Sequence, residues 1–130
     1  SVSVSYDPYN RGDSLFSISA LPANGVSFED AQKAIQAEVD ALKTEDIPKH
    51  ELERITTRFV SNLIYNQDSI AGQAKMIGNL EVNGLSYRLM DELPKYYENV
   101  SMSDIQRVAN SYFIRENLST LYLAPETKAQ

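Results

Sequence analysis

The chain lacks cysteine and tryptophan and contains one histidine, His50. Without cysteine there is no disulfide, no thiolate metal site and no cysteine nucleophile. A single histidine excludes both H-E-x-x-H and H-x-x-E-H, because each motif places two imidazoles on one helix face. Glu51 does follow His50, but the second imidazole would stand at Arg54, whose guanidinium has only donors. We therefore expect His50 to be an exposed residue in the first turn of a helix, not a metal ligand or general base.

Long apolar runs and an excess of positive charge are also absent. No run approaches the roughly 20 residues that cross a membrane. The chain has 12 basic and 18 acidic residues, a net charge of -6, which argues against a nucleic-acid partner. Acids interrupt the densest basic cluster: Lys49, His50, Arg54 and Arg58 are interspersed with Glu45, Asp46, Glu51 and Glu53. We interpret this cluster as a solvated helix face.

What is present is the pattern of a globular α+β domain. The 130 residues are 42% hydrophobic and 23% charged, enough for one domain with a core. Two segments near the N-terminus alternate in polarity: Val2, Val4 and Tyr6 with serines, then Phe16, Ile18 and Ala20 with Ser17 and Ser19. Joined by the turn-rich residues 7–14, they predict an antiparallel hairpin. Leu121 and Leu123 share one face of a predicted closing strand over residues 119–124.

The middle of the chain has helical periodicity. Apolar residues step by three and four in a helix that Ser27 caps, with Asp30 as the acidic third residue. A second helix has Pro48 in its first turn and a stripe of Leu52, Ile55, Phe59 and Leu63, with Arg54 and Arg58 expected on the opposite side.

Three further helices are predicted. One is capped by Asp68 or Ser69 and ends at Asn83 and Gly84, the next carries Leu85, Leu89 and Leu93 up to a bend or end at Pro94, and the last is capped by Ser101 with Asp104. We expect the helices to cover one face of an antiparallel sheet, in a single α+β subdomain over residues 1–124 with order strand, strand, helices, strand. Residues 125–130 are predicted to begin a linker.

No candidate catalytic, cofactor-binding or metal-binding residue emerges from these patterns. Arg11-Gly12-Asp13 resembles an integrin-binding tripeptide but is expected to be a hairpin loop. Two N-x-S/T sequences lie where helix caps also favour Asn and Ser. Their residues are Asn99 to Ser101 and Asn117 to Ser119. The paired acids are interpreted as helix surface: Glu29/Asp30, Glu45/Asp46, Glu51/Glu53 and Asp91/Glu92.

The ordered segments resemble the insulinase/pitrilysin-type zinc metalloproteases, which include the mitochondrial processing peptidases. The resemblance covers the hairpin "SVSVSYDPYNRGDSLFSISALPANG", an "EL-x-R" helix start at Glu51 to Arg54, a helix with a Gly-Leu stop at Gly84-Leu85, and a "V-(S/T)-x-x-D-(I/V)-x-x-VA" helix from Val100 to Ala109. It implies homologous α+β halves, each of two subdomains, that close around a peptide substrate. It also implies zinc in the parent protein, on an H-x-x-E-H helix with a later glutamate as third ligand.

By this resemblance the chain is the second subdomain of one half, without the zinc motif or the family's Arg…Gly-Leu-x-Tyr segment. We therefore expect no zinc and no catalysis by this chain alone, which would form part of the peptide-enclosing chamber and support the zinc-bearing subdomain. Its partners would be the remaining subdomains or a homologous subunit. The alternative is a piece of an inactive homologue acting as partner or scaffold of an active protease, and a stand-alone binding module is a third reading. The compartment stays open, although the bacterial members suggest the periplasm.

Overall fold

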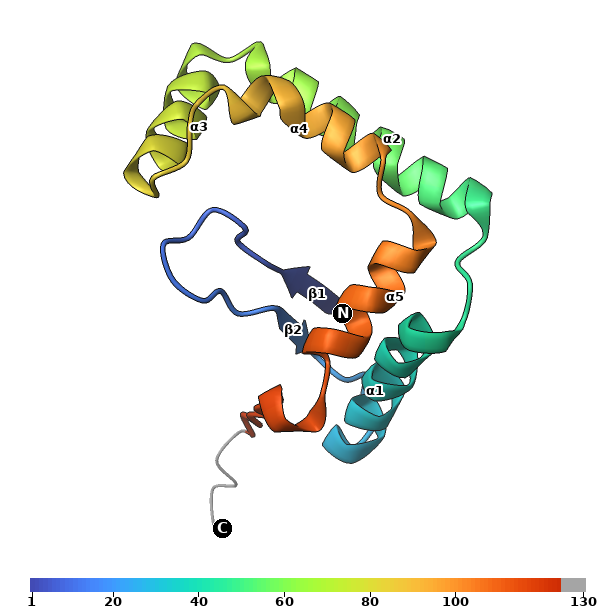
Figure 1. Cartoon of the computed structure of the whole chain (residues 1–130). Coiled ribbons are helices and arrows are strands. Elements are labelled where there is room, and N and C mark those ends of the chain that lie inside the picture. The colour runs from blue at the N-terminus through green and yellow to red at the C-terminus, as the bar shows by residue number, and fades with distance from the viewer. Residues whose placement is uncertain (125–130) are drawn as a thin grey trace. The chain divides into compact units, whose positions relative to one another are not determined.

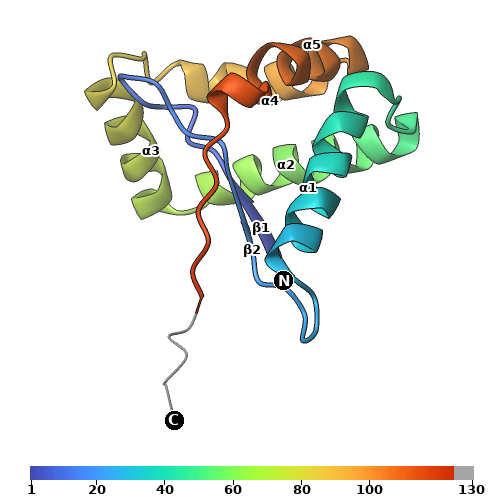
Figure 2. The same cartoon turned by 90° about the horizontal axis from the view of Figure 1, so that it is seen from below.

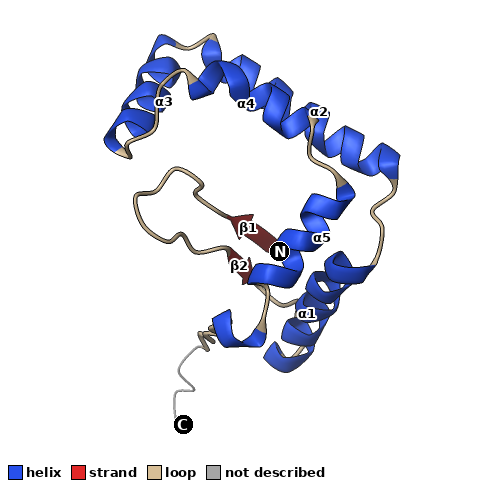
Figure 3. Ribbon diagram, viewed as in Figure 1, coloured by secondary structure: helices blue, strands red, loops and turns tan. Residues whose placement is uncertain are grey.

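The computed structural model describes residues 1–124, which form a two-stranded antiparallel sheet and five α-helices (Figures 1 and 3). The predicted α+β class is thereby confirmed; the predicted linker at 125–130 lies outside the described residues. The elements are β1 (Val2–Ser5), β2 (Ser17–Ala20), α1 (Phe28–Thr44), α2 (Lys49–Gln67), α3 (Ile70–Val82), α4 (Leu89–Glu98), α5 (Met102–Tyr112) and the 3-10 turn η1 (Arg115–Asn117).

The predicted hairpin is confirmed, with β1 and β2 side by side (Figure 2). Val2 lies opposite Ala20 and Ser5 opposite Ser17. Its ladder continues one step beyond the strands. The Ser1 ammonium donates to the Leu21 carbonyl at 3.0 Å, and the Leu21 amide donates to the Ser1 carbonyl at 2.8 Å. The polar alternation therefore has the expected period of two, with serines on one face of both strands.

Contacts divide the chain into two compact units. Unit 1 is Ser1–Leu21 with Asp46–Met102, and unit 2 is Pro22–Glu45 with the chain from Ser103 onward. That residues 1–124 form a single subdomain stays a prediction.

Unit 1 is held by α2, which packs against α3 and α4 (Figure 1). Its buried apolar side chains are Val60 of α2, Leu80 of α3 and Leu93 of α4, and among them Leu80 has no exposed surface. The rings of Phe59 and Tyr97 join α2 to α4 with their centroids 4.3 Å apart. Three side chains are a small core for this many helices.

In unit 2, α1 and α5 are joined largely by polar contacts. The Asn110 amide donates to the Lys43 carbonyl at 3.1 Å, and the Gln106 amide donates to the Glu45 carbonyl at 3.4 Å. Ala109 is the buried apolar residue of this unit among the described residues. Phe28 of α1 contacts the Tyr122 ring at a centroid distance of 5.7 Å.

The helix boundaries follow the predicted caps. Ser27 accepts a hydrogen bond from the Asp30 amide at 3.0 Å and donates to the Asp30 carboxylate at 2.7 Å. Ser69, one of the two residues predicted to cap α3, accepts from the Gly72 amide at 3.2 Å. At the other end, Gly84 has φ +79°, the left-handed conformation that glycine adopts at low cost.

Two predictions about elements are wrong. The fourth helix begins at Leu89, so Leu85 lies outside it. Pro94 does not end this helix, which runs to Glu98, and the alternative of a bend at Pro94 stays a prediction. Residues 119–124 are not a strand: within the described chain they carry no ladder (Figure 2). Alternating polarity shows which side chains share a face, but it does not supply a second strand. A strand forms only when a neighbouring strand satisfies its backbone hydrogen-bonding groups.

The side chains of residues 119–124 alternate as predicted, but the apolar face points outward. Tyr122 donates a hydrogen bond to the Gln32 side chain of α1, and Thr120 accepts from Gln32 at 3.5 Å. Leu121 and Leu123, predicted to face a sheet, are 94% and 89% exposed.

No helix among the described residues is both long and apolar enough to cross a membrane.

Candidate functional site

His50 lies in the first turn of α2 and is exposed, as the sequence indicated. Two members of the basic cluster around it, Arg54 and Lys49, form ordinary surface ion pairs. Arg54 pairs with Glu51 at 3.1 Å and Lys49 with Glu53 at 3.5 Å, one helical turn apart in each case. Exposed pairs of this kind contribute up to about 1 kcal/mol.

The other motifs of the sequence lie in exposed, structural positions. Arg11, Gly12 and Asp13 are exposed in the loop between β1 and β2. Asn99 donates through its side-chain amide to the Lys95 carbonyl at 2.7 Å, and Asn117 donates to the Tyr112 carbonyl at 3.2 Å. Both asparagines thus satisfy carbonyls at helix ends.

The paired acids do not gather into a metal site. Over residues 1–124, no three His, Asp or Glu side chains come close enough to hold a metal ion. Zinc, which the resemblance implies for the parent protein, therefore does not fit the donor set of the described chain, since catalytic zinc takes three protein ligands.

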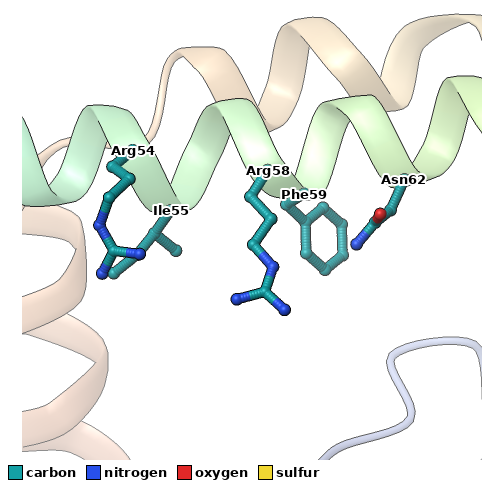
Figure 4. Close-up of a pocket in the computed structure, with 5 residues that line it drawn as sticks. All are labelled: Arg54, Ile55, Arg58, Phe59 and Asn62. Carbon is teal, nitrogen blue, oxygen red and sulfur yellow. The ribbon is translucent and has the colours of Figure 1, made fainter.

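The structure does form a shallow groove along one face of α2, with a volume of about 220 Å³. Figure 4 shows its lining, in which the side chains extend from the same side of the helix. The lining residues are Arg54, Ile55, Arg58, Phe59 and Asn62. We call this set the α2 groove.

The α2 groove corrects one expectation. Arg54 and Arg58 were expected opposite the apolar stripe, but they lie beside Ile55 and Phe59. Adjacent helix positions are separated by only 100°, so a residue opposite Leu52 still borders Ile55. The sequence did contain a signal for this groove. Positions 54, 55, 58, 59 and 62 have the spacing of one helix face, on which arginine, apolar residues and asparagine lie together.

Next to the α2 groove, Phe59 belongs to an aromatic cluster with Tyr97 and Tyr9. Burial raises the pKa of Tyr9 to about 12, with further contributions from the charge and hydrogen bond of Tyr97 and from the charge of Asp7. The cluster connects the hairpin loop, α2 and α4 within unit 1. Tyr97 therefore packs against the Phe59 ring while its phenol meets that of Tyr9.

These observations define an α+β chain with an exposed, mixed cationic and apolar helix face and no metal site in its described part. No family model matches the chain. The zinc protease PqqE of Helicobacter pylori (strain ATCC 700392 / 26695) is 28% identical to it over 119 residues, which are 88% of this chain and 26% of that protein. The chain thus spans about a quarter of the length of this curated relative. The similarity relates the chain to part of a protease-like protein.

Proposed function

We propose that the chain is a non-catalytic portion of a zinc-dependent endopeptidase of the insulinase/pitrilysin type, the second subdomain of one of its homologous halves. The observation that supports this is the similarity to a zinc protease over 119 residues, nearly the whole chain but only 26% of the relative. A segment that aligns almost end to end with a quarter of a larger protease is expected to have a structural role there.

The sparse core of the described residues also supports the proposal. Only Val60, Leu80, Leu93 and Ala109 are buried apolar residues among residues 1–124, while many large apolar side chains are exposed. Exposed apolar surface on this scale commonly marks a surface that another domain covers. In the proposed parent, the neighbouring subdomains would cover it, and the chain would form part of the wall that encloses the peptide.

The test has two parts. Elemental analysis of the purified chain is expected to find no stoichiometric zinc, and a stoichiometric zinc content would contradict the proposal. The parent reading frame is expected to encode H-x-x-E-H on a helix with a later glutamate. A parent in which those histidines or the glutamate are replaced would instead make the chain a piece of an inactive partner subunit.

A further inference from the structure

The α2 groove contains features that a merely solvated helix face does not require. From them we infer that this face binds an extended peptide segment with carboxylates at alternate positions. The binding rests on the geometry of α2 alone, whereas its role as a substrate contact rests on the proposed function.

Charge selects an anionic partner. The lining of the groove contains two guanidinium groups and no carboxylate. Arg54 forms an exposed ion pair with Glu51 at 3.1 Å. Arg58 makes no ion pair with another described residue. A guanidinium presents a planar fork of donors that matches a carboxylate in two parallel hydrogen bonds. The chain as a whole is acidic, so this face differs in sign from the net charge of -6.

The distance between Arg54 and Arg58 along α2 favours a peptide in extended conformation whose carboxylates are two residues apart. Residues four apart on a helix are separated by about 6 Å along the axis. Alternate residues of an extended strand are separated by about 6.6 to 6.8 Å and point to the same side. Two acids at alternate positions of an extended peptide therefore meet Arg54 and Arg58 together, whereas adjacent acids point to opposite sides and only one can pair.

The rest of the lining favours an extended peptide over a helix or a small molecule. Asn62 makes no hydrogen bond with another described residue, and its amide offers both donors and an acceptor. An extended peptide has backbone groups to pair with such an amide, whereas a helix has already satisfied its own. The volume of about 220 Å³ is below the range of about 300 to 1,000 Å³ typical of small-molecule pockets, so it suits one or two side chains.

Apolar contact is available beside the charges. Ile55 and Phe59 are 47% and 44% exposed, and the Phe59 ring is held against Tyr97 at 4.3 Å. Because this contact restrains the ring, less rotamer entropy is lost when a ligand packs against it. A third same-side position of the peptide would thus favour an apolar side chain.

The experiment measures fluorescence anisotropy of a labelled peptide, Ser-Asp-Ser-Asp-Ser-Leu, titrated with the full chain at low salt. We expect saturable binding that weakens as salt increases. Arg58→Gln is expected to raise Kd about fivefold, the upper range for an exposed charge pair, and Arg58→Lys to restore it only in part because lysine lacks the fork. Since Arg58 is exposed, circular dichroism should show both variants folded.

Arg107→Gln is the control for the loss of an arginine outside the groove. Arg107 of α5 is as exposed as Arg54, and it pairs with Asp104 at 3.2 Å in the same three-residue spacing. It lies outside the α2 groove, so its replacement should leave Kd unchanged. Equal weakening by Arg107→Gln, or equal affinity for peptides with Asn in place of Asp or with the two acids adjacent, would overturn the inference.

These outcomes are separate from those that test the proposed function. A parent without a zinc motif would leave peptide binding intact and remove only its link to a substrate. Conversely, an active zinc protease whose Arg58→Gln chain binds the peptide normally would retain the proposed function and refute this site.

Discussion

At the scale of single residues, Tyr9 shows how a hairpin loop can be tied to a helix pair. Its phenol lies partly buried beside Tyr97, and burial raises its pKa to about 12 from an ordinary value of 10.0. A raised pKa in the folded state means that folding favours the neutral phenol. The stabilisation is complete below about pH 10 and is lost as the pH rises toward 12, because the unfolded chain releases this proton first.

We expect Tyr9 to titrate near pH 12 in the folded protein and Tyr97→Phe to lower that pKa toward 10, since Tyr97 contributes to the shift after burial. The chain has eight tyrosines, so site-resolved carbon NMR of the ring is the suitable measurement. Tyr9→Phe should make stability less dependent on pH between about 10 and 12. A folded Tyr9 that titrates near 10 would contradict the loop contact.

At the scale of elements, α3 contains two glycines with opposite roles. An added Cβ at Gly72 would lie 2.6 Å from the Asn66 backbone oxygen and 3.3 Å from Cβ of Ser69, which caps the helix. At Gly78, the same atom would meet nothing within 4 Å. Gly72 thus permits the end of α2 to lie close to the start of α3. Gly78 has no such role, and as a glycine inside a helix it loses more backbone entropy on folding than an alanine would.

Gly72→Ala and Gly78→Ala are therefore expected to have opposite effects on the free energy of unfolding, measured by urea denaturation. Gly78→Ala should stabilise by about 0.5 to 1 kcal/mol, because alanine is the better helix former. Gly72→Ala should destabilise by about 1 to 3 kcal/mol, because the backbone must move to avoid the clash. Stabilisation by both substitutions would mean that the turn between α2 and α3 is not closely packed.

Local signals in the sequence predicted helices and turns better than they predicted contacts between distant segments. The hairpin, the caps Ser27 and Ser69 and the stop at Gly84 are properties of a few neighbouring residues, and they were found. The start of α4 at Leu89, with Leu85 outside the helix, was not found.

The predicted strand over residues 119–124 is absent, because a strand needs a pairing strand elsewhere in the chain, and alternating polarity does not show whether one is available. The α2 groove was missed for a related reason. The sequence pattern assigned Phe59 to an apolar face of the helix and Arg58 to a charged face. In the structure the two side chains lie side by side on one face of α2. No catalytic or metal residue was predicted for this chain, and that expectation stays a prediction.

At the scale of the molecule, stability rests on few buried side chains. Leu80 is fully buried in unit 1, and only Val60 and Leu93 accompany it there as buried apolar residues of the described chain. A protein is stable by only about 5 to 15 kcal/mol, so a single cavity can remove a large part of it. The isolated chain should therefore be sensitive to one core truncation.

Leu80→Ala is expected to cost about 2 to 5 kcal/mol and to reduce amide hydrogen-exchange protection throughout α2, α3 and α4. Val82→Ala is the control in the same helix, since Val82 is 72% exposed and should lose almost nothing. Unchanged protection in α3 after Leu80→Ala would refute the described core. Loss that extends to α1 and α5 would support the single subdomain predicted from the sequence, whereas confinement to unit 1 would favour two independent units.

The outward leucines near the C-terminal end of the described chain bear on how the protein behaves when concentrated. Residues 119–124 read Ser-Thr-Leu-Tyr-Leu-Ala, six residues without charge, proline or glycine, with Leu121 and Leu123 almost fully exposed. Uncharged segments of this length with high strand propensity can stack into cross-β fibrils. Gatekeeper residues normally flank such segments, and here Pro125 and Glu126 follow directly in the sequence. If the protein forms fibrils on storage at high concentration, we expect them to grow from this segment, and replacing Leu121 with a charged residue to prevent them.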